Sequence, residues 1–284
     1  MTAVALIAVK LAVAVLIMAI GMGSSFVDVT YLLRRPALLL RSLGAMYVLV
    51  PLVTVLMVAF LPLNTGVKAA LMVLAVSAGA PLLPRKLQQF GDGAYGFSLV
   101  VVSSVVAIVV TPLWVALLAR HFGVSAELSW RDAALAIGTA FLAPLMVGMA
   151  LGAYFPRLAA DYAERLSAAA ALVLTTAGVV LLAVNWHILV EVRLTGMLAL
   201  LGVMIMALVI GHICGGPKEM DRTTLAIACA TRHIGIAVIV ATAFRGPRTI
   251  VILAAYVVAS ALVSIPYLRW RRGSPRVAKS GEPA

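Results

Sequence analysis

Nine long apolar runs dominate this chain and restrict its fold more than any other feature. Each is close to the 20 or so residues that an α-helix needs to cross a bilayer. Hydrophobic residues make up 64% of the 284 positions and charged residues 11%, whereas soluble domains carry about 25% charged residues. The sequence therefore predicts an all-α polytopic membrane protein with about nine transmembrane helices. The runs cover approximately residues 3–22, 38–61, 67–90, 95–118, 133–155, 166–184, 194–215, 222–244 and 248–268.

The positive charge is distributed unevenly over the connections between the runs. The chain has 22 Lys+Arg against 10 Asp+Glu, a net charge of +12. The connections on the side of the C-terminus hold about twice as many Lys and Arg residues as those on the other side. Because cytoplasmic loops of membrane proteins are rich in Lys and Arg, we expect an external N-terminus and a cytoplasmic C-terminus, in the cytoplasmic (inner or plasma) membrane. This rule accounts for the positive charge, so no nucleic-acid partner is expected.

The longest connection divides the chain into two unequal halves. Residues 1–118 form a first repeat with four helices, and residues 133–268 a second repeat with five. Residues 119–132 connect the halves, and residues 269–284 form a basic cytoplasmic tail that we expect to be disordered. This division predicts two related structural units, each built from membrane-spanning helices.

A recurring spacing supports that relationship. Pro81 and Pro112 lie 31 residues apart, and so do Gly235 and Pro266. Both pairs are related by one shift of 154 positions, which maps the third run onto the eighth and the fourth onto the ninth. An odd number of crossings separates mapped partners, so they have opposite orientations. The pattern predicts an inverted-topology repeat, an architecture of secondary transporters.

The third and eighth runs are both interrupted near their middles. The third contains Gly79, Pro81 and Pro84, and proline lacks the N–H that a continuous helix requires. The eighth contains Arg232 and Gly235 at the corresponding depth. Discontinuous helices at matching places of two halves indicate a transport site. A packed helix with a simple proline kink is the alternative.

Arg232 lies about ten residues from either end of its run, too deep to reach water easily. An arginine at the centre of a membrane helix costs about 2.5–3.5 kcal/mol on insertion scales, and no acidic residue shares its run. We expect it to face a cavity and bind an anionic substrate; bonding to the carbonyls of the broken helix is the alternative. The candidate substrate-binding residues are Arg232, His233, Thr231, Gly235, Ser77, Gly79, Pro81, Ser103 and Ser104.

Other residue types have less specific interpretations. His233 can titrate near neutral pH or stay neutral as a hydrogen-bonding group. The hydroxyls of Ser103 and Ser104 either line the site or bond to carbonyls of their own helix. Gly138, Gly148 and Gly152 are expected to serve helix packing.

Several functional classes are not supported by any motif. No run carries an Asp or Glu at mid-membrane depth, which argues against a carboxylate-driven pump and against aspartyl proteolysis. There is no nucleotide-binding motif. Cys214 and Cys229 lie in apolar runs and predict neither a disulfide framework nor a metal site. We therefore expect no enzyme activity, no metal and no cofactor.

Three stretches resemble the bile acid:sodium symporter family. They are GMGSSFVDVTYLLRRPALLLRSLGAMYVLVPL, GAPLLPRKLQQFGDGAYGFSLVVVSS and ATRHIGIAV. The resemblance implies a ten-helix inverted repeat, of which this chain lacks the first helix. It also implies a core domain with two crossed discontinuous helices and a panel domain that slides against it. The first, fifth and sixth runs would form the panel.

The sodium ligands of that family do not carry over. Their positions fall at Ala228, Arg232 and Met46, and near Lys86 and Leu87. Sodium coupling is therefore not expected, and Arg232 would supply a fixed positive charge instead.

The resemblance and the residues together predict a secondary active transporter. It would move a small organic anion, bile-acid-like or another carboxylate or sulfonate, across the membrane by alternating access. The alternatives are a proton-coupled or facilitative carrier of a neutral solute, and a non-transporting membrane sensor or subunit on the same scaffold. The expected partners are this small molecule and the lipid bilayer.

Overall fold

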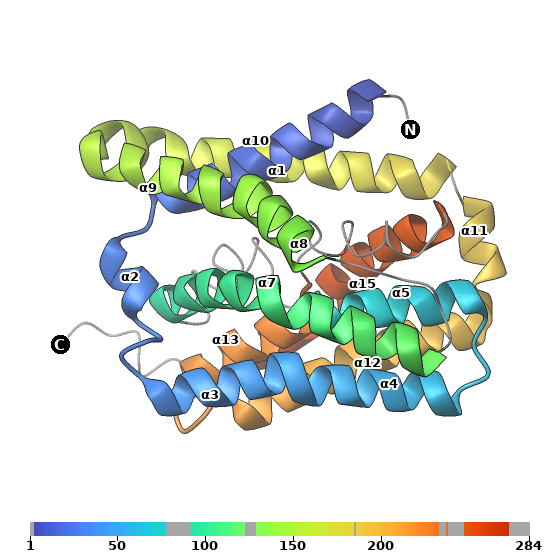
Figure 1. Cartoon of the computed structure of the whole chain (residues 1–284). Coiled ribbons are helices and arrows are strands. Elements are labelled where there is room, and N and C mark those ends of the chain that lie inside the picture. The colour runs from blue at the N-terminus through green and yellow to red at the C-terminus, as the bar shows by residue number, and fades with distance from the viewer. Residues whose placement is uncertain are drawn as a thin grey trace.

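The computed structural model describes residues 3–77, 92–122, 129–184, 186–232, 237 and 247–272, and these residues form helices joined by short loops (Figure 1). Two π-helical turns, η1 (Ala45–Leu49) and η2 (Gly138–Leu142), join α3 to α4 and α8 to α9. The all-α prediction is confirmed. The helices are α1 (Ala3–Met22), α2 (Phe26–Thr30), α3 (Pro36–Gly44), α4 (Val50–Phe60), α5 (Thr65–Val76), α7 (Gly93–Phe122), α8 (Trp130–Ile137), α9 (Ala143–Tyr154), α10 (Pro156–Val184), α11 (Trp186–Glu191), α12 (Arg193–Cys214), α13 (Glu219–Ala230) and α15 (Pro247–Arg272).

Four of the described helical segments are long and apolar enough to cross a bilayer unaided. They are Pro36–Phe60, Gly93–Leu118, Pro156–Val184 and Leu194–Cys214. Leu11–Met22, Thr65–Val76 and Gly138–Tyr154 are apolar but shorter. The expected nine crossings stay a prediction, because parts of the third and eighth runs lie outside the described residues.

The helices form two layers (Figure 1). In one layer, α1 packs lengthwise against both α9 and α10. In the other, α12 contacts α4 and α13, and α15 contacts α5. The first layer contains the first, fifth and sixth apolar runs, the three that the family resemblance assigns to the panel.

Two glycines allow α1 and α9 to approach closely. A Cβ atom added at Gly148 would lie 2.0 Å from the carbonyl oxygen of Met18, and one at Gly152 would lie 2.5 Å from that of Met22. Both distances are far below van der Waals contact, so only glycine fits there. The packing role expected for Gly148 and Gly152 is confirmed. It is wrong for Gly138, where an added Cβ meets nothing within 4 Å.

Pro51 explains a hydrogen bond between the segment Pro36–Phe60 and α7. Pro51 has no N–H, so the carbonyl of Tyr47, four residues earlier, loses its regular helical donor. The indole Nε1–H of Trp114 on α7 donates to this carbonyl at 2.9 Å. The π-helical turn η1 lies at this place, and π-helical turns accompany local changes in a helical hydrogen-bond ladder. The proline therefore creates an acceptor that connects two helices.

Three boundaries differ from the sequence-based expectation. Helix α10 begins at Pro156, ten residues before the sixth apolar run, because its polar first turns are exposed and proline suits a first helical position. Helix α7 extends to Phe122 and α8 begins at Trp130, so less of 119–132 is loop than expected. Helix α15 continues to Arg272, and buried Arg271 belongs to the helical body rather than to a disordered tail. Residues 273–284 lie outside the described part of the chain.

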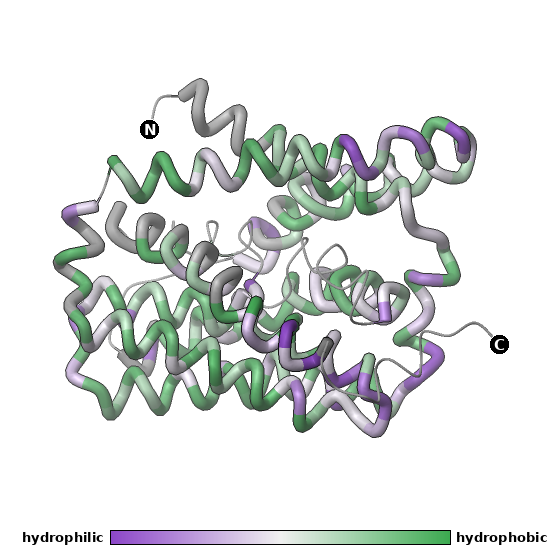
Figure 2. Tube along the Cα trace, turned by 180° about the vertical axis from the view of Figure 1, so that it is seen from behind, coloured by the Kyte–Doolittle hydropathy of each residue, from purple (hydrophilic) through white to green (hydrophobic). Residues whose placement is uncertain are grey.

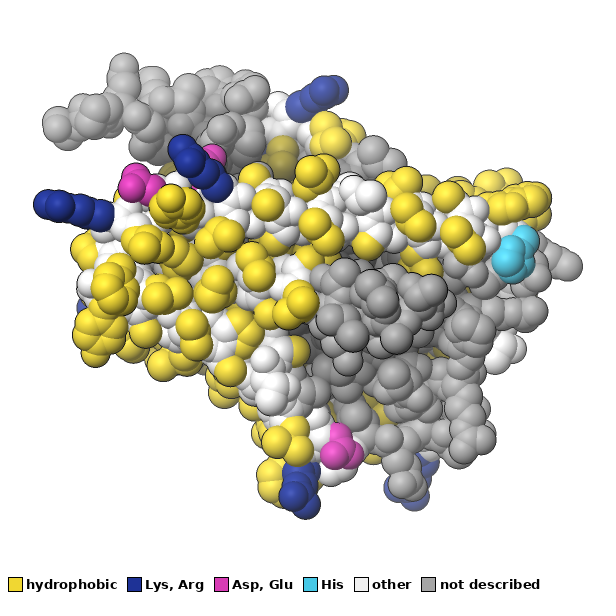
Figure 3. All heavy atoms as spheres, turned by 90° about the horizontal axis from the view of Figure 1, so that it is seen from above, with side chains coloured by type: hydrophobic (Ala, Val, Ile, Leu, Met, Phe, Trp, Pro, Cys, Tyr) yellow, Lys and Arg dark blue, Asp and Glu magenta, His cyan; other side chains and the backbone are white. Residues whose placement is uncertain are grey.

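The outer surface of the first layer is apolar. Figure 3 shows hydrophobic side chains over most of the coloured part of this face, with charged side chains near its ends. In the tube view of Figure 2, hydrophobic residues also fill the long middle stretches of the helices. An apolar surface of this kind is suited to contact with the hydrocarbon core of a bilayer. On α10 the exposed side chains include Leu172, Val173, Val179, Val180 and Val184.

Candidate functional site

The two short helices α5 and α13 end inside the protein at equivalent positions. Each has twelve residues. Their first residues, Thr65 and Glu219, lie 154 positions apart, and so do their last residues, Val76 and Ala230. This is the shift that the proline and glycine spacing indicates. The last turns of both helices are fully buried, so their ends are parts of the interior and not surface loops.

The ends of these two helices are built alike. Ser77 and Thr231 occupy the C-cap positions, and each is buried. The hydroxyl of Ser77 donates to the carbonyl of Val73 at 2.7 Å, and that of Thr231 donates to the carbonyl of Ile227 at 2.7 Å. The hydroxyl of Ser77 thereby satisfies an acceptor in the last turn, where a helix lacks its own donors, whereas the carbonyl of Ile227 also accepts the backbone N–H of Thr231 at 2.9 Å.

A later helix provides a second donor to each end. Thr111 of α7 donates to the carbonyl of Val76 at 3.2 Å, and the hydroxyl of Tyr256 on α15 donates to the carbonyl of Ala230 at 2.8 Å. In Figure 1, α5 enters from the right and α13 from the left, with their C-terminal ends directed inward. Helix C-termini carry partial negative charge, so this arrangement favours a positive charge between them.

Arg232 follows the cap of α13 and brings a positive charge next to the end of this helix. Its side chain is buried, with 4% of the residue exposed. Among the described residues, none of its three guanidinium nitrogens has a hydrogen-bond partner. The phenols of Tyr47 and Tyr256 lie within electrostatic range of it, and the hydroxyl of Tyr256 uses its proton on Ala230. A buried cation with unused donors is unfavourable unless a ligand occupies them.

The other predicted site residues divide into two groups. The hydroxyls of Ser103 and Ser104 are buried and donate to the carbonyl of Val100, at 3.1 and 2.7 Å. This is the bonding to their own helix that was the alternative to lining a site. His233, Gly235, Gly79 and Pro81 lie outside the described residues. A substrate-binding role stays a prediction for all nine.

A cavity of about 890 Å³ lies elsewhere, between the two layers. The ends of α1 and α9 and the start of α10 line one side, and α2 and the start of α7 line the other. Small residues such as Gly23, Gly93, Gly152 and Ala163 leave the space open, and the carboxylates of Asp28 and Glu164 also line it. Its lining contains none of the predicted site residues that the structure describes. Sequence reasoning missed this cavity, because only packing shows which small residues face one another.

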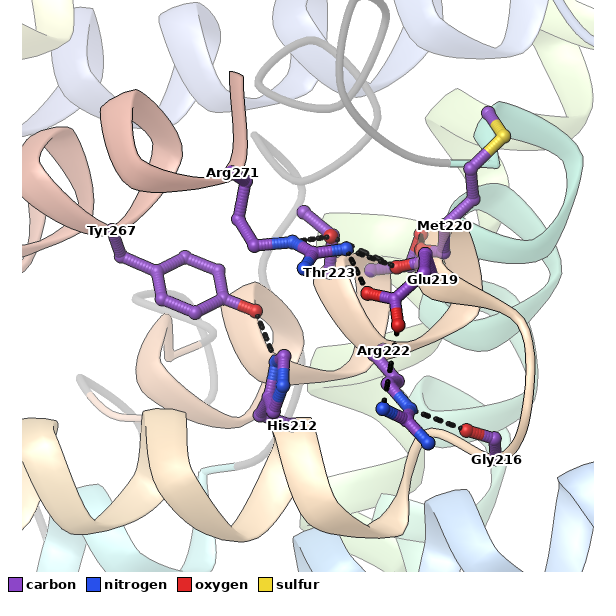
Figure 4. Close-up of polar contacts among 9 residues, drawn as sticks. His212, Gly216, Glu219, Met220, Arg222, Thr223, Tyr267 and Arg271 are labelled. Atoms are coloured by element: carbon purple, nitrogen blue, oxygen red, sulfur yellow. Dashed lines mark hydrogen bonds and ion pairs between the residues drawn. The ribbon is translucent and has the colours of Figure 1, made fainter. Parts of the chain in front are cut away.

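The first turn of α13 is anchored by an ionic network (Figure 4). Arg271 at the end of α15 donates to Glu219 Oε2 at 2.6 Å and to Thr223 Oγ1 at 2.9 Å. Arg222 donates to the carbonyl of Gly216 at 2.6 Å. The hydrogen bond from Arg271 is the main reason why the pKa of the Glu219 carboxyl lies below its usual value. This network fixes the outer end of the helix whose inner end carries Arg232.

No group of three or more His, Cys, Asp and Glu side chains within the described ranges is arranged to hold a metal ion. The arrangement instead presents a buried cation next to the capped C-terminal end of α13.

Comparison with known proteins identifies the family. The model of the sodium bile acid symporter family matches residues 10–192, which is more than half of the chain. The match includes α5 and ends before α13, so Arg232 lies beyond it. No individual curated protein matches the chain significantly. This multi-pass membrane protein therefore belongs to the sodium bile acid symporter family, whose members are transporters and not enzymes.

Proposed function

We propose that this protein is a secondary transporter that carries a small organic anion across the cytoplasmic membrane by alternating access. Family membership supports transport, and Arg232 is the single observation that supports an anion. Its guanidinium is buried and its three nitrogens have no partner in the described part of the chain. A carboxylate or sulfonate would accept two parallel hydrogen bonds from such a fork.

The helix ends explain how an unfilled cation is tolerated between transport events. The partial negative charge of the α13 C-terminus lies next to Arg232 and stabilises its positive charge. The carbonyl oxygens of Val76 and Ala230 already accept hydrogen bonds from Thr111 and Tyr256. The donors of the guanidinium therefore stay available for a substrate.

Equivalent helix ends support the alternating-access part of the proposal. The shared shift of 154 positions, the paired caps Ser77 and Thr231, and the approach of α5 and α13 from opposite sides are features of an inverted repeat. In such folds, substrates bind where discontinuous helices meet, and one layer moves against the other. The N-terminus would be external and the C-terminus cytoplasmic.

The cavity between the layers fits a substrate passage. Its volume of about 890 Å³ lies within the range of roughly 300–1,000 Å³ of small-molecule sites. It lies beside the loops before α2 and before α10, on the side that charge counting assigns to the cytoplasm. Asp28 and Glu164 line it, so an anion would bind at Arg232 rather than at this mouth.

The test uses the purified full chain and a panel of ligands. Bile acids and aromatic sulfonates are compared with neutral analogues of the same size, by thermal shift and by uptake into proteoliposomes. We expect only the anions to raise the melting temperature. Stabilisation by neutral analogues alone would contradict an anion substrate and favour a carrier of neutral solutes.

Substitutions at Arg232 separate binding from structure. Arg232→Lys should keep the fold and weaken anion binding by about 1–3 kcal/mol, the contribution of a charge-assisted hydrogen bond. Arg232→Ala should abolish binding without lowering the melting temperature, because it removes a buried charge. Arg131→Ala, at an exposed arginine near the start of α8, is the matched control. An early-melting Ala variant together with a Lys variant that transports normally would show a structural role instead.

A further inference from the structure

Two aspartates lie close together where the first turn of α13 meets the start of α7. Asp92 directly precedes α7, and Asp221 lies in the first turn of α13. The backbone N–H of Asp92 donates to the hydroxyl of Thr224 at 3.1 Å, which joins the two helix starts. Neither carboxyl group belongs to the network of Arg271 or to the surroundings of Arg232.

Both carboxylate oxygens of Asp92 accept hydrogen bonds. Its Oδ2 accepts the hydroxyl proton of Tyr31 at 2.5 Å, and its Oδ1 accepts the backbone N–H of Tyr95 at 2.9 Å. Arg35 donates to the Tyr31 hydroxyl, and its guanidinium carbon lies 4.1 Å from the centre of that ring. An aspartate that accepts with both oxygens presents negative charge to its neighbours.

Asp221 has the opposite environment. Only 4% of the residue is exposed, and its Oδ1 is buried without a hydrogen-bond partner among the described residues. It lies within electrostatic range of Asp92. A buried carboxylate that has another carboxylate within electrostatic range and lacks a donor on one oxygen is unfavourable when ionised. A proton on this oxygen removes the repulsion.

The charged and titratable groups around Asp221 are consistent with a proton on its carboxyl. Burial and Asp92 raise the pKa of the Asp221 carboxyl, whereas Lys218 and Arg35 lower it, and the net direction is upward. Burial and the bond to Asp92 raise the pKa of Tyr31, so its proton stays in place. Tyr95 of α7 also faces this cluster. The surroundings of Asp221 therefore favour its protonated form.

We propose that Asp221 is a proton-binding site, at which one proton is held on the buried carboxyl of Asp221 beside Asp92. A proton fits better than a metal ion, because the described residues around Asp221 include no group of three or more His, Cys, Asp and Glu side chains that could hold one. Release of the proton places a second negative charge between α7 and α13. The occupancy of the site then affects how α13, which leads to Arg232, is held at its outer end.

Infrared difference spectroscopy of the purified full chain tests the site directly. We expect a protonated carboxyl band that persists above about pH 5, where ordinary aspartates have lost their protons. The band should disappear in Asp221→Asn and remain in Asp161→Asn, a change at an exposed aspartate of α10. In Asp92→Asn, removal of the like charge should shift the titration of the band to lower pH.

The pH dependence of stability gives a second readout. A raised pKa means that the folded state binds the proton more tightly than the unfolded state, so stability falls as pH rises through the folded-state pKa. Asp221→Asn should flatten this fall and raise the melting temperature at pH 7 to 8.

Three results would contradict the proposal that Asp221 binds a proton. They are a band that survives in Asp221→Asn, a wild-type band that is absent above pH 5, and an Asp221→Asn variant that melts earlier than wild type throughout the pH range. If Asp221→Asn does not fold, the pH at which the carboxyl band titrates in Asp92→Asn decides: a band that titrates as in the wild type would contradict the site. Because no substrate is used, the outcome is independent of the proposed transport function.

Discussion

The crossing of α1 and α9 makes a quantitative prediction about Gly148. A Cβ atom there would lie 2.0 Å from the carbonyl oxygen of Met18, whereas ordinary contact requires roughly 3.4 Å. In Gly148→Ala the two helices must therefore separate by about 1 Å. Such a gap removes a quarter to a half of the dispersion energy of each contact along the crossing. Overpacking typically lowers the free energy of unfolding by about 1–3 kcal/mol. Because the methyl group of Gly148→Ala would clash with backbone atoms, we expect a loss at the upper end of this range, about 3 kcal/mol.

The measurement compares melting temperatures in one detergent for three variants. Gly148→Ala should melt clearly earlier than wild type. Gly138→Ala and Gly178→Ala place the same methyl group where nothing lies within 4 Å, and both should melt within a degree or two of wild type or slightly later, because alanine favours helix. If Gly148→Ala is as stable as these two controls, the close approach of the helices is wrong.

Three further changes have defined outcomes. Trp114→Phe keeps an aromatic ring but leaves the carbonyl of Tyr47 without a donor, which should cost about 1–3 kcal/mol in thermal unfolding; an unchanged melting temperature would contradict the contact. Arg271→Gln should lower the melting temperature at pH 7. Since the pKa of Glu219 is lowered by Arg271, this loss should shrink as pH falls below about 4, where the carboxyl gains its proton, and a pH-independent loss would exclude Glu219 as the partner. Sodium should stabilise the protein no more than potassium at equal ionic strength, and a saturable sodium-specific shift would refute this expectation.

Those features of the fold that depend on apolar periodicity and on proline could be read from the sequence. Helix α1 has the predicted bounds of residues 3 and 22, because apart from Lys10 its sequence consists of apolar residues and glycine. The shift of 154 positions found between two Gly/Pro pairs recurs in the bounds of α5 and α13. The start of α10 was missed, because charged residues in its first turns do not resemble a membrane segment, although they are exposed and helical.

The candidate site was predictable only where a residue is unusual by itself. Arg232 is conspicuous as an arginine in an apolar run, and it is buried as expected. The proximity of Asp92 and Asp221 has no local signal, because the two residues are 129 positions apart and each is an ordinary acidic residue at the start of a helix. Pro51 indicates that the carbonyl of Tyr47 lacks a helical donor, but no sequence pattern identifies Trp114 as its replacement. Such partners follow from packing, which a single sequence does not specify.

The contact of α1 with α9 and α10 has a consequence for how the chain is made. About 120 residues separate the end of α1 at Met22 from the start of α9 at Ala143. At about 5–20 residues per second, a ribosome needs roughly 6–24 s to synthesise this interval. During that time α1 is inserted in the membrane without the partners that its surface at Met18 and Met22 matches. Helix α1 is thus synthesised well before its final neighbours, and a truncated chain that ends before α9 would leave it exposed to quality-control proteases.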